Sequence, residues 1–259
     1  MQNVRLANRH VLYVASMVCL FAKVLLTLKY RRSALGILWS LVSPLTLTLT
    51  TTVVFSSIFH LRFQDHILSV SIGMICWIYF NQVIFNSSSI YIQFENLIKK
   101  LSFPLYVLPL AVVLSSALDL LLYMVGALII SLGHLKAPGL LFSLLILFSL
   151  TIFATGTALY VSVVNVFYRD FQWIISVVMQ ALFFLTPIAY KVKDIDDGLL
   201  RVIVMVNPLA DFVNSFTDSV LYGAYNMKSL LYLLAIGAAN LLVGIYIYAR
   251  NKYSIVVYL

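Results

Sequence analysis

Twenty consecutive residues without a charge, residues 171–190, set the strongest constraint on how this chain can fold. An α-helix rises about 1.5 Å per residue, so a helix of this length crosses a hydrocarbon layer about 30 Å thick. Charges lie just outside both ends, since Arg169 and Asp170 precede the segment and five charged residues fall within 191–197. We therefore predict a transmembrane helix here.

Five further segments have membrane-spanning length and almost no charge: residues 35–59, 67–94, 105–132, 140–167 and 230–249. The segment 105–132 is interrupted only by Asp119. With 63% hydrophobic and 10% charged residues, the chain has too little polar surface to cover a soluble domain. We predict an all-α integral membrane protein with six transmembrane helices, forming one domain over residues 1–259, with spans one to five in 35–190.

Residues 1–32 are predicted to form an amphipathic helix in the membrane interface. Its apolar run, 11–22, ends at Lys23 and is too short to span. Polar side chains recur at helical spacing along one face, namely Arg9, Tyr13, Ser16, Lys23 and Thr27, with Leu20 as the one apolar member. The basic cluster at 29–32 suits anionic lipid headgroups. No short apolar core with a cleavage site opens the sequence, so we expect this helix to stay on the mature protein.

The distribution of Lys and Arg predicts the orientation. The side that includes both termini receives eleven basic residues against two acids, whereas the other side receives six against six. Positive charge favours the cytoplasmic side, so both termini are predicted to be cytoplasmic. The net charge of +8 is thereby explained by membrane topology, and we expect no nucleic-acid partner.

Residues 191–227 are predicted to hold a re-entrant pair of helices. The segments 199–206 and 209–221 are apolar, yet each is too short to span and both carry charges. Two short helices that enter the outer leaflet and return, with a break at Asn207-Pro208, satisfy both facts. The alternative is a partly helical outer loop. We expect an apolar gate over a translocation path, formed by Ile203, Val206, Asn207, Pro208, Phe212 and Phe216.

No glycine stands in a GxxxxGK[ST] arrangement, so the chain lacks the loop that cradles ATP phosphates. We expect a transport protein without enzymatic activity, cofactor or metal. Two alternatives stay open. Asp194 and Asp196 have the D-x-D spacing that could chelate the metal of a nucleotide sugar in a glycosyltransferase, although they fall on the predicted outer side. Asp119 could relay protons in a proton-coupled transporter, or it could be a hydrogen-bonded residue that fixes helix packing.

Aromatic residues on spans one, two and five are candidates for contact with a transported substrate, because a flat ring can stack on an apolar face without a fixed hydrogen-bond partner. Interface belts and ordinary packing explain such residues equally well. The channel candidates are Trp39, Trp77, Tyr79, Phe80, Trp173, Phe183, Phe184 and Tyr190.

The chain resembles the permease subunits of ABC-type polysaccharide exporters, above all those for O-antigen. The resemblance rests on short motifs in a shared order: YRRSALGILW at 30–39 followed by Pro44, NVFYRD at 165–170, LTPIAY at 185–190 and NPL at 207–209. It implies a homodimer in the inner membrane, an ATP-binding-cassette ATPase as partner, and a lipid-linked polysaccharide as substrate.

Between spans two and three, residues 95–104 carry apolar and basic side chains at short helical spacing and end at a proline. On the residues alone, a small helix that docks on a cytoplasmic partner and a plain loop with lysines are equally good interpretations. The resemblance implies contact with the ATPase, and it assigns this coupling role to Glu95, Leu97, Lys99, Lys100 and Phe103.

Overall fold

The computed structural model of the protein describes residues 2–31, 33–130, 137–192, 195 and 198–259. The elements within those ranges are helices, which confirms the all-α prediction. In chain order they are α1 (Gln2–Tyr30), the 3-10 helix η1 (Gly36–Leu38), α2 (Trp39–Ile58), α3 (Phe63–Gln93), α4 (Glu95–Ile98), α5 (Val107–Ile130), α6 (Ala137–Phe167), α7 (Phe171–Phe184), α8 (Leu199–Val206), α9 (Pro208–Tyr222) and α10 (Met227–Tyr258).

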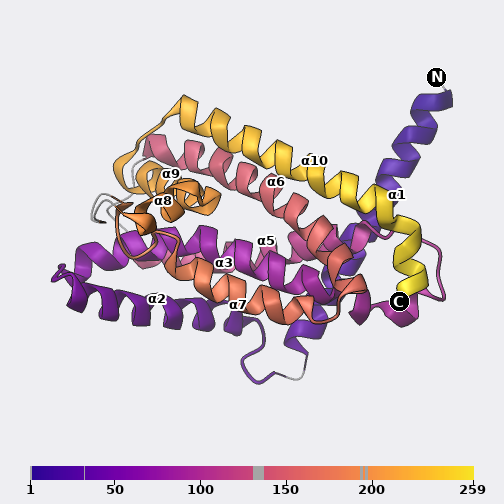
Figure 1. Cartoon of the computed structure of the whole chain (residues 1–259), viewed down its shortest axis with the longest axis horizontal. Helices are drawn as coiled ribbons and strands as arrows, with labels where there is room; N and C mark the ends of the chain where they lie inside the picture. Colours follow the sequence, from indigo (N-terminus) through magenta and orange to yellow (C-terminus); the bar gives the residue numbers. More distant parts are fainter. Residues whose placement is uncertain (1, 32, 131–136, 193–194, 196–197) are drawn as a thin grey trace.

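The bundle has two distinct ends (Figure 1). Helices α2, α3, α5, α6, α7 and α10 run along the long axis of the molecule. Helices α8 and α9 lie together at one end, which we call the hairpin end. Helix α4 and both chain termini lie at the opposite end, which we call the termini end.

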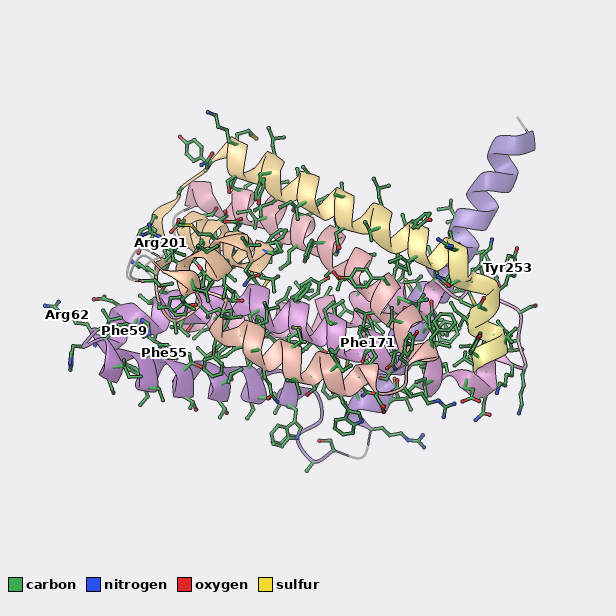
Figure 2. The ribbon with its side chains drawn as sticks, viewed as in Figure 1. Phe55, Phe59, Arg62, Phe171, Arg201 and Tyr253 are labelled. Carbon is green, nitrogen blue, oxygen red and sulfur yellow. The ribbon has the colours of Figure 1, made fainter. Side chains whose placement is uncertain are left out.

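The charged residues separate between these ends as the sequence predicts. Arg62 and Arg201 are two of the six basic residues counted on the outer side, and both lie at the hairpin end (Figure 2). Tyr253 lies at the termini end, next in sequence to Arg250 and Lys252, which were counted on the side of the termini. This separation agrees with the two sides of the membrane counted from the sequence. That the termini end faces the cytoplasm stays a prediction.

Helices α2, α3, α5, α6 and α10 correspond to five of the predicted spans, and each is long and apolar enough to cross a membrane. Helices α3, α6 and α10 contain 31, 31 and 32 residues. At about 1.5 Å per residue they exceed a hydrocarbon layer of about 30 Å by several turns. The chain is therefore a multi-pass membrane protein, and its longest helices have more residues than an upright crossing requires.

The predicted fifth span, residues 171–190, is wrong in one respect. Helix α7 ends at Phe184 after 14 residues, and the chain continues to Tyr190 without regular structure. Pro187 explains the end, because a proline disfavours helical geometry at the residue before it. At about 1.5 Å per residue, α7 by itself reaches about 21 Å, short of a full crossing.

Helix α1 has the amphipathic arrangement that the sequence predicts. Tyr13, Leu20 and Lys23 are exposed, while Phe21 and Ala22 are buried against the bundle. The axis of α1 crosses the termini end at a steep angle to the other helices (Figure 1). By length and composition alone its segment Val11–Tyr30 also qualifies as a span, so the six candidate spans include α1 and omit α7. The interface position of α1 stays a prediction.

Helix α3 is the centre of the bundle. It packs against α2, α5, α6, α7 and α9, and its segment from Val70 to Phe80 is continuously buried. The buried residues of α3 belong to a large apolar cluster that surrounds this helix. A second apolar cluster, at the termini end, joins α1 to the last turns of α3, α6 and α10 and to the first turns of α5. Helices α6 and α10 form the most extensive helix pair.

Candidate functional site

The break between α8 and α9 is held by Asn207. The two helices are bent by 76°, and Asn207 lies in extended conformation between them, as predicted for the residue before a proline. Its Oδ1 accepts a hydrogen bond from the Leu209 backbone N–H at 3.0 Å and caps α9. Its Nδ2 donates to the Leu185 carbonyl oxygen at 3.2 Å and to Thr186 Oγ1 at 3.0 Å. One side chain thus joins the start of α9 to the end of α7.

The carbonyl groups at the end of α7 are satisfied by side chains. The Tyr190 hydroxyl donates a hydrogen bond to the Phe184 carbonyl oxygen at 2.8 Å, and Asn207 Nδ2 donates one to the Leu185 carbonyl oxygen. The last carbonyl groups of any helix lack partners within it, and these two donors satisfy the Phe184 and Leu185 carbonyl groups where α7 ends. The early end of α7 and the break after α8 are therefore one linked structure.

The predicted gate residues divide into two groups. Ile203 and Val206 on α8 are exposed, and Val206 is 76% accessible. Phe212 and Phe216 on α9 are fully buried, packed in the cluster that surrounds α3. The two short helices are confirmed, and Pro208 begins α9 as predicted. In one chain, only the α8 side chains are placed to meet lipid, a second copy or a passing substrate.

The predicted coupling segment is a shorter helix than expected. Helix α4 contains four residues, and the chain from Leu101 to Pro104 has no regular structure. Phe103 stacks on Phe21 of α1 with ring centroids 5.3 Å apart, and Leu97 packs against the same cluster. Lys100 and Leu101 are exposed, Leu101 by 56%. The apolar members of the segment therefore hold it to the bundle, and its exposed residues are left for a partner.

Lys99 ties the segment to α10. Its Nζ donates to Glu95 Oε1 at 2.6 Å and to the backbone carbonyl oxygen of Leu259 at 2.7 Å. The hydrogen bond from Lys99 and then its positive charge hold the pKa of Glu95 below its usual value, so the Glu95 carboxylate remains charged at neutral pH. Lys99 thus has both of these hydrogen-bond partners within this chain, and its contact with the ATPase stays a prediction.

The predicted aromatic channel residues also divide. Trp77, Tyr79 and Phe80 on α3 are buried in the core, and Phe183 on α7 packs against Trp77 with ring centroids 5.4 Å apart. Tyr190 is partly buried and bonded to Phe184. The exposed rings are Trp39 at the start of α2, and Trp173 and Phe184 on α7. These exposed rings are the ones that can meet a sugar chain or a second copy.

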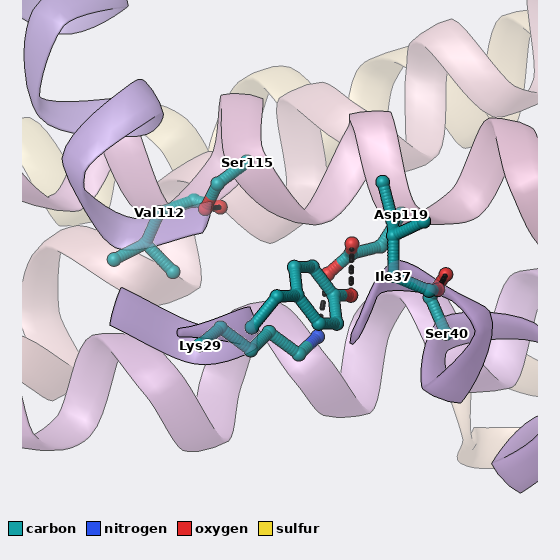
Figure 3. Close-up of polar contacts among 7 residues, drawn as sticks. Lys29, Ile37, Ser40, Val112, Ser115 and Asp119 are labelled. Atoms are coloured by element: carbon teal, nitrogen blue, oxygen red, sulfur yellow. Dashed lines mark hydrogen bonds and ion pairs between the residues drawn. The ribbon is translucent and has the colours of Figure 1, made fainter. Parts of the chain in front are cut away.

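Asp119 lies in a polar cluster between α5 and the end of α1 (Figure 3). The side chain of Asp119 is 5% accessible, and its Oδ2 pairs with Lys29 Nζ at 2.5 Å. Its Oδ1 accepts a hydrogen bond from the Tyr30 hydroxyl at 2.6 Å. A buried carboxylate with a cation and a hydroxyl donor has its charge compensated.

A cavity of about 470 Å³ opens beside this cluster, between α1, α3 and α5. Its polar lining consists of Lys29, Asp119, Asn86, Gln93 and Ser115. Its apolar walls come chiefly from leucines of α1 and from Ile90, Phe94 and Val112. The cavity combines both signs of charge with neutral donors and acceptors.

Two functional features were missed in the sequence. Lys29 and Tyr30 were assigned to a headgroup-binding cluster, and their pairing with an acid 90 and 89 residues away was not foreseen. The available signal was the cost of an unpaired acid inside a span, which requires a basic partner. The link from Asn207 to α7 was also missed. Asp194 and Asp196 of the proposed D-x-D site lie outside the described residues.

One protein family and three known proteins are similar to this chain. A family described as ABC-2 type transporter matches residues 17–221. Two proteins of Klebsiella pneumoniae, both called O-antigen export system permease protein RfbA, are each 27% identical over 231 residues, covering 88% of this chain and 89% of the relative. A protein of the same name from Myxococcus xanthus is 27% identical over 192 residues, covering 73% and 74%. The family match extends from α1 into α9.

Proposed function

We propose a function from one premise: this chain belongs to the ABC-2 type transporter family. Such a chain is a transport subunit, and ATP hydrolysis resides in an ATP-binding-cassette partner. We propose that it is the transmembrane subunit of an exporter that moves a lipid-linked polysaccharide of the O-antigen type outward across the inner membrane. In this proposal both termini face the cytoplasm, and two copies of the chain form the path.

One observation carries the choice of substrate. Relatives named for O-antigen export align with most of this chain, from 73% to 88% of its length. The sequence supports the division of labour, because no GxxxxGK[ST] motif is present to bind ATP phosphates. The exposed rings of Trp39, Trp173 and Phe184 support a surface that a sugar chain can slide along, since stacking requires no fixed hydrogen-bond geometry.

The partners follow from the same proposal. The ATPase contacts the exposed part of the segment 95–104 at the termini end, where Lys100 and Leu101 are accessible. The second copy meets exposed apolar helix surfaces, among which α7 and the start of α2 carry the exposed aromatic rings. The α8 side chains Ile203 and Val206 complete the seal at the hairpin end.

Deletion of the gene in its source organism tests this function. We expect surface O-antigen to disappear while its lipid-linked precursor accumulates inside the cell, because synthesis continues without export. Complementation by this chain should restore the surface polymer only when the partner ATPase is active. A glycosyltransferase would instead lose the precursor itself, and a proton-coupled transporter would keep exporting with an inactive ATPase. Either result contradicts the proposal.

A further inference from the structure

The cavity between α1, α3 and α5 has the features of a built binding site. Asp119 and Lys29 form a charged wall on one side, with Asp119 almost fully buried. Asn86 and Gln93, both exposed, add carboxamide donors and acceptors from α3. Neither forms a hydrogen bond with the described part of the chain, so both are free for a ligand. A volume of about 470 Å³ lies within the range of small-ligand sites, about 300 to 1,000 Å³.

Helix lengths place the cavity near the lipid headgroups. A hydrocarbon layer about 30 Å thick takes about 20 helical residues. Counted from Asp65 at the hairpin end of α3, that length ends near Phe85, next to Asn86. Counted from Lys228 on α10, it ends near Tyr248, before Arg250 and Lys252. The cavity begins at this level and continues toward the termini end, where Gln93 and Phe94 close it.

The charges of the cavity favour a zwitterionic ligand. Lys29 and Asp119 compensate each other at 2.5 Å, so the wall carries no net charge. A ligand with one phosphate and one ammonium group can contact both, its phosphate near Lys29 and its ammonium near Asp119, and each protein charge then gains a further opposite partner. An ammonium with hydrogens also donates hydrogen bonds to the carboxylate, and the carboxamides of Asn86 and Gln93 can serve the phosphate.

We propose that this cavity binds the headgroup of a phospholipid carrying a phosphate and a primary amine, a phosphoethanolamine lipid of the leaflet at the termini end. The leucines of α1 and Ile90 then contact the first carbons of the acyl chains. Such a lipid would hold α1 to the bundle through Lys29 and Asp119, the pair that already joins the last turn of α1 to α5. The proposal is independent of the exported substrate.

Other lipid classes fit less well for stated reasons. A lipid with a net negative headgroup brings its phosphate toward the Asp119 carboxylate without supplying a cation, so repulsion offsets its contact with Lys29. A choline headgroup keeps its charge but has no hydrogen to donate to Asp119. The cavity should therefore select ethanolamine over both choline and glycerol headgroups.

Thermal unfolding and native mass spectrometry of the purified full-length protein test the selection. After delipidation in detergent, we would add phosphatidylethanolamine, phosphatidylcholine or phosphatidylglycerol with identical acyl chains. At about 100 times its Kd, phosphatidylethanolamine should raise Tm by about 5 to 10 °C and remain bound in the mass spectrum. The other two lipids should give less than half of that shift.

Gln93→Leu is the informative variant, and Gln180→Leu on the exposed surface of α7 is its matched control. Gln93→Leu removes a carboxamide that contacts the phosphate, so it should lose most of the Tm shift given by phosphatidylethanolamine with little change in the Tm of the lipid-free protein, whereas Gln180→Leu should keep the shift. Asn86→Leu provides a second variant on α3 should Gln93→Leu fold poorly. Equal shifts from all three lipids, or an undiminished phosphatidylethanolamine shift in both cavity variants, would overturn the proposal. Binding of soluble glycerophosphoethanolamine as tightly as the lipid would overturn the assignment to a membrane lipid.

Discussion

Asp119 shows how a charged residue is tolerated inside this bundle. Its carboxylate is compensated by Lys29 and by the Tyr30 hydroxyl, both from the last turn of α1. Breaking a buried ion pair leaves one uncompensated charge, which costs more than replacing both partners by apolar groups. The arrangement favours a structural role for Asp119 over a proton relay, because a relay must release and rebind its proton during each cycle.

We predict that Lys29→Met destabilises the protein by about 2 to 4 kcal/mol, because Asp119 is then left unpaired. The double variant Lys29→Met/Asp119→Leu should recover most of that loss, since no charge remains buried. Thermal unfolding of the single and double variants measures the difference.

Export in the double variant separates the two roles of Asp119. A folded double variant that still delivers O-antigen to the surface excludes the relay. Normal folding with complete loss of export would return Asp119 to the list of functional residues.

Local sequence patterns predicted which residues are unusual, but they did not predict which distant residues these contact. Hydropathy identified Asp119 as an acid in a span, and the proline rule identified the break at Asn207. Their partners lie 90 and 22 residues away in the sequence, beyond the reach of any helical period. Pro187 and the charged residues after it indicate the end of the fifth span in the sequence, but the helix ends earlier, at Phe184.

At the scale of elements, the segment 95–104 contains residues that pack against the rest of the chain and other residues that are exposed. Phe103 and Leu97 pack on the cluster that includes Phe21, and Lys99 is engaged with Glu95 and α10. The amphipathic pattern in the sequence is thus explained in part by packing within the chain. Contact of this segment with the ATPase stays a prediction, and within the segment the exposed residues are the ones available for it.

We predict that Leu101→Asp abolishes copurification with the ATPase while leaving Tm unchanged, because Leu101 is 56% accessible and contributes little to packing. Phe103→Ala should instead lower stability by about 1 to 3 kcal/mol, through loss of its stacked contact with Phe21. Affinity copurification and thermal unfolding, run on both variants, distinguish the two effects. If Leu101→Asp binds the ATPase normally, this surface is not the contact.

Helices α8 and α9 form the second element with a predicted role. The short helices and their break were foreseen because neither apolar piece can span alone and Pro208 cannot donate a backbone hydrogen bond. The burial of α9 in the core was not foreseen, since it depends on contacts with α3 and α6.

Cysteine labelling tests whether this pair returns within the membrane. In a variant without native cysteines, a cysteine at Asn207, which is 8% accessible, should react slowly with an impermeant thiol reagent added outside. A cysteine at Gly198, which is exposed, should react rapidly. Rapid labelling at both positions would indicate an ordinary outer loop.

At the scale of the whole molecule, α6 and α10 form a closely packed pair. A Cβ atom on Gly244 would lie 2.3 Å from the Gly156 carbonyl oxygen, and one on Gly156 would lie 2.5 Å from the Asn240 carbonyl oxygen. Asn240 also donates to the Phe153 carbonyl oxygen at 2.7 Å and to Thr157 Oγ1 at 2.8 Å. Small residues and one carboxamide therefore let the two backbones touch, as in many membrane helix pairs.

We predict that Gly244→Ala destabilises the protein by about 1 to 3 kcal/mol, because a backbone must move to admit the new methyl group. Gly126→Ala on α5 is the matched control, since the nearest atoms to its Cβ belong to flexible side chains, Leu41 Cδ1 at 2.5 Å and Leu45 Cδ1 at 3.8 Å, and not to a backbone. Thermal unfolding in detergent compares them. An equal Tm for Gly244→Ala and the control would contradict the close approach.

This pair also sets an order of events during synthesis. Helix α6 ends at Phe167, whereas α10 begins at Met227, about 60 residues later in the chain. At about 5 to 20 residues per second, the ribosome needs roughly 3 to 12 s to produce the residues between them. During that interval the glycine face of α6 has no partner from its own chain and must be covered by lipid or by an insertion factor. Helix α10 is made after α7, α8 and α9, and it then completes the most extensive helix contact within the described residues.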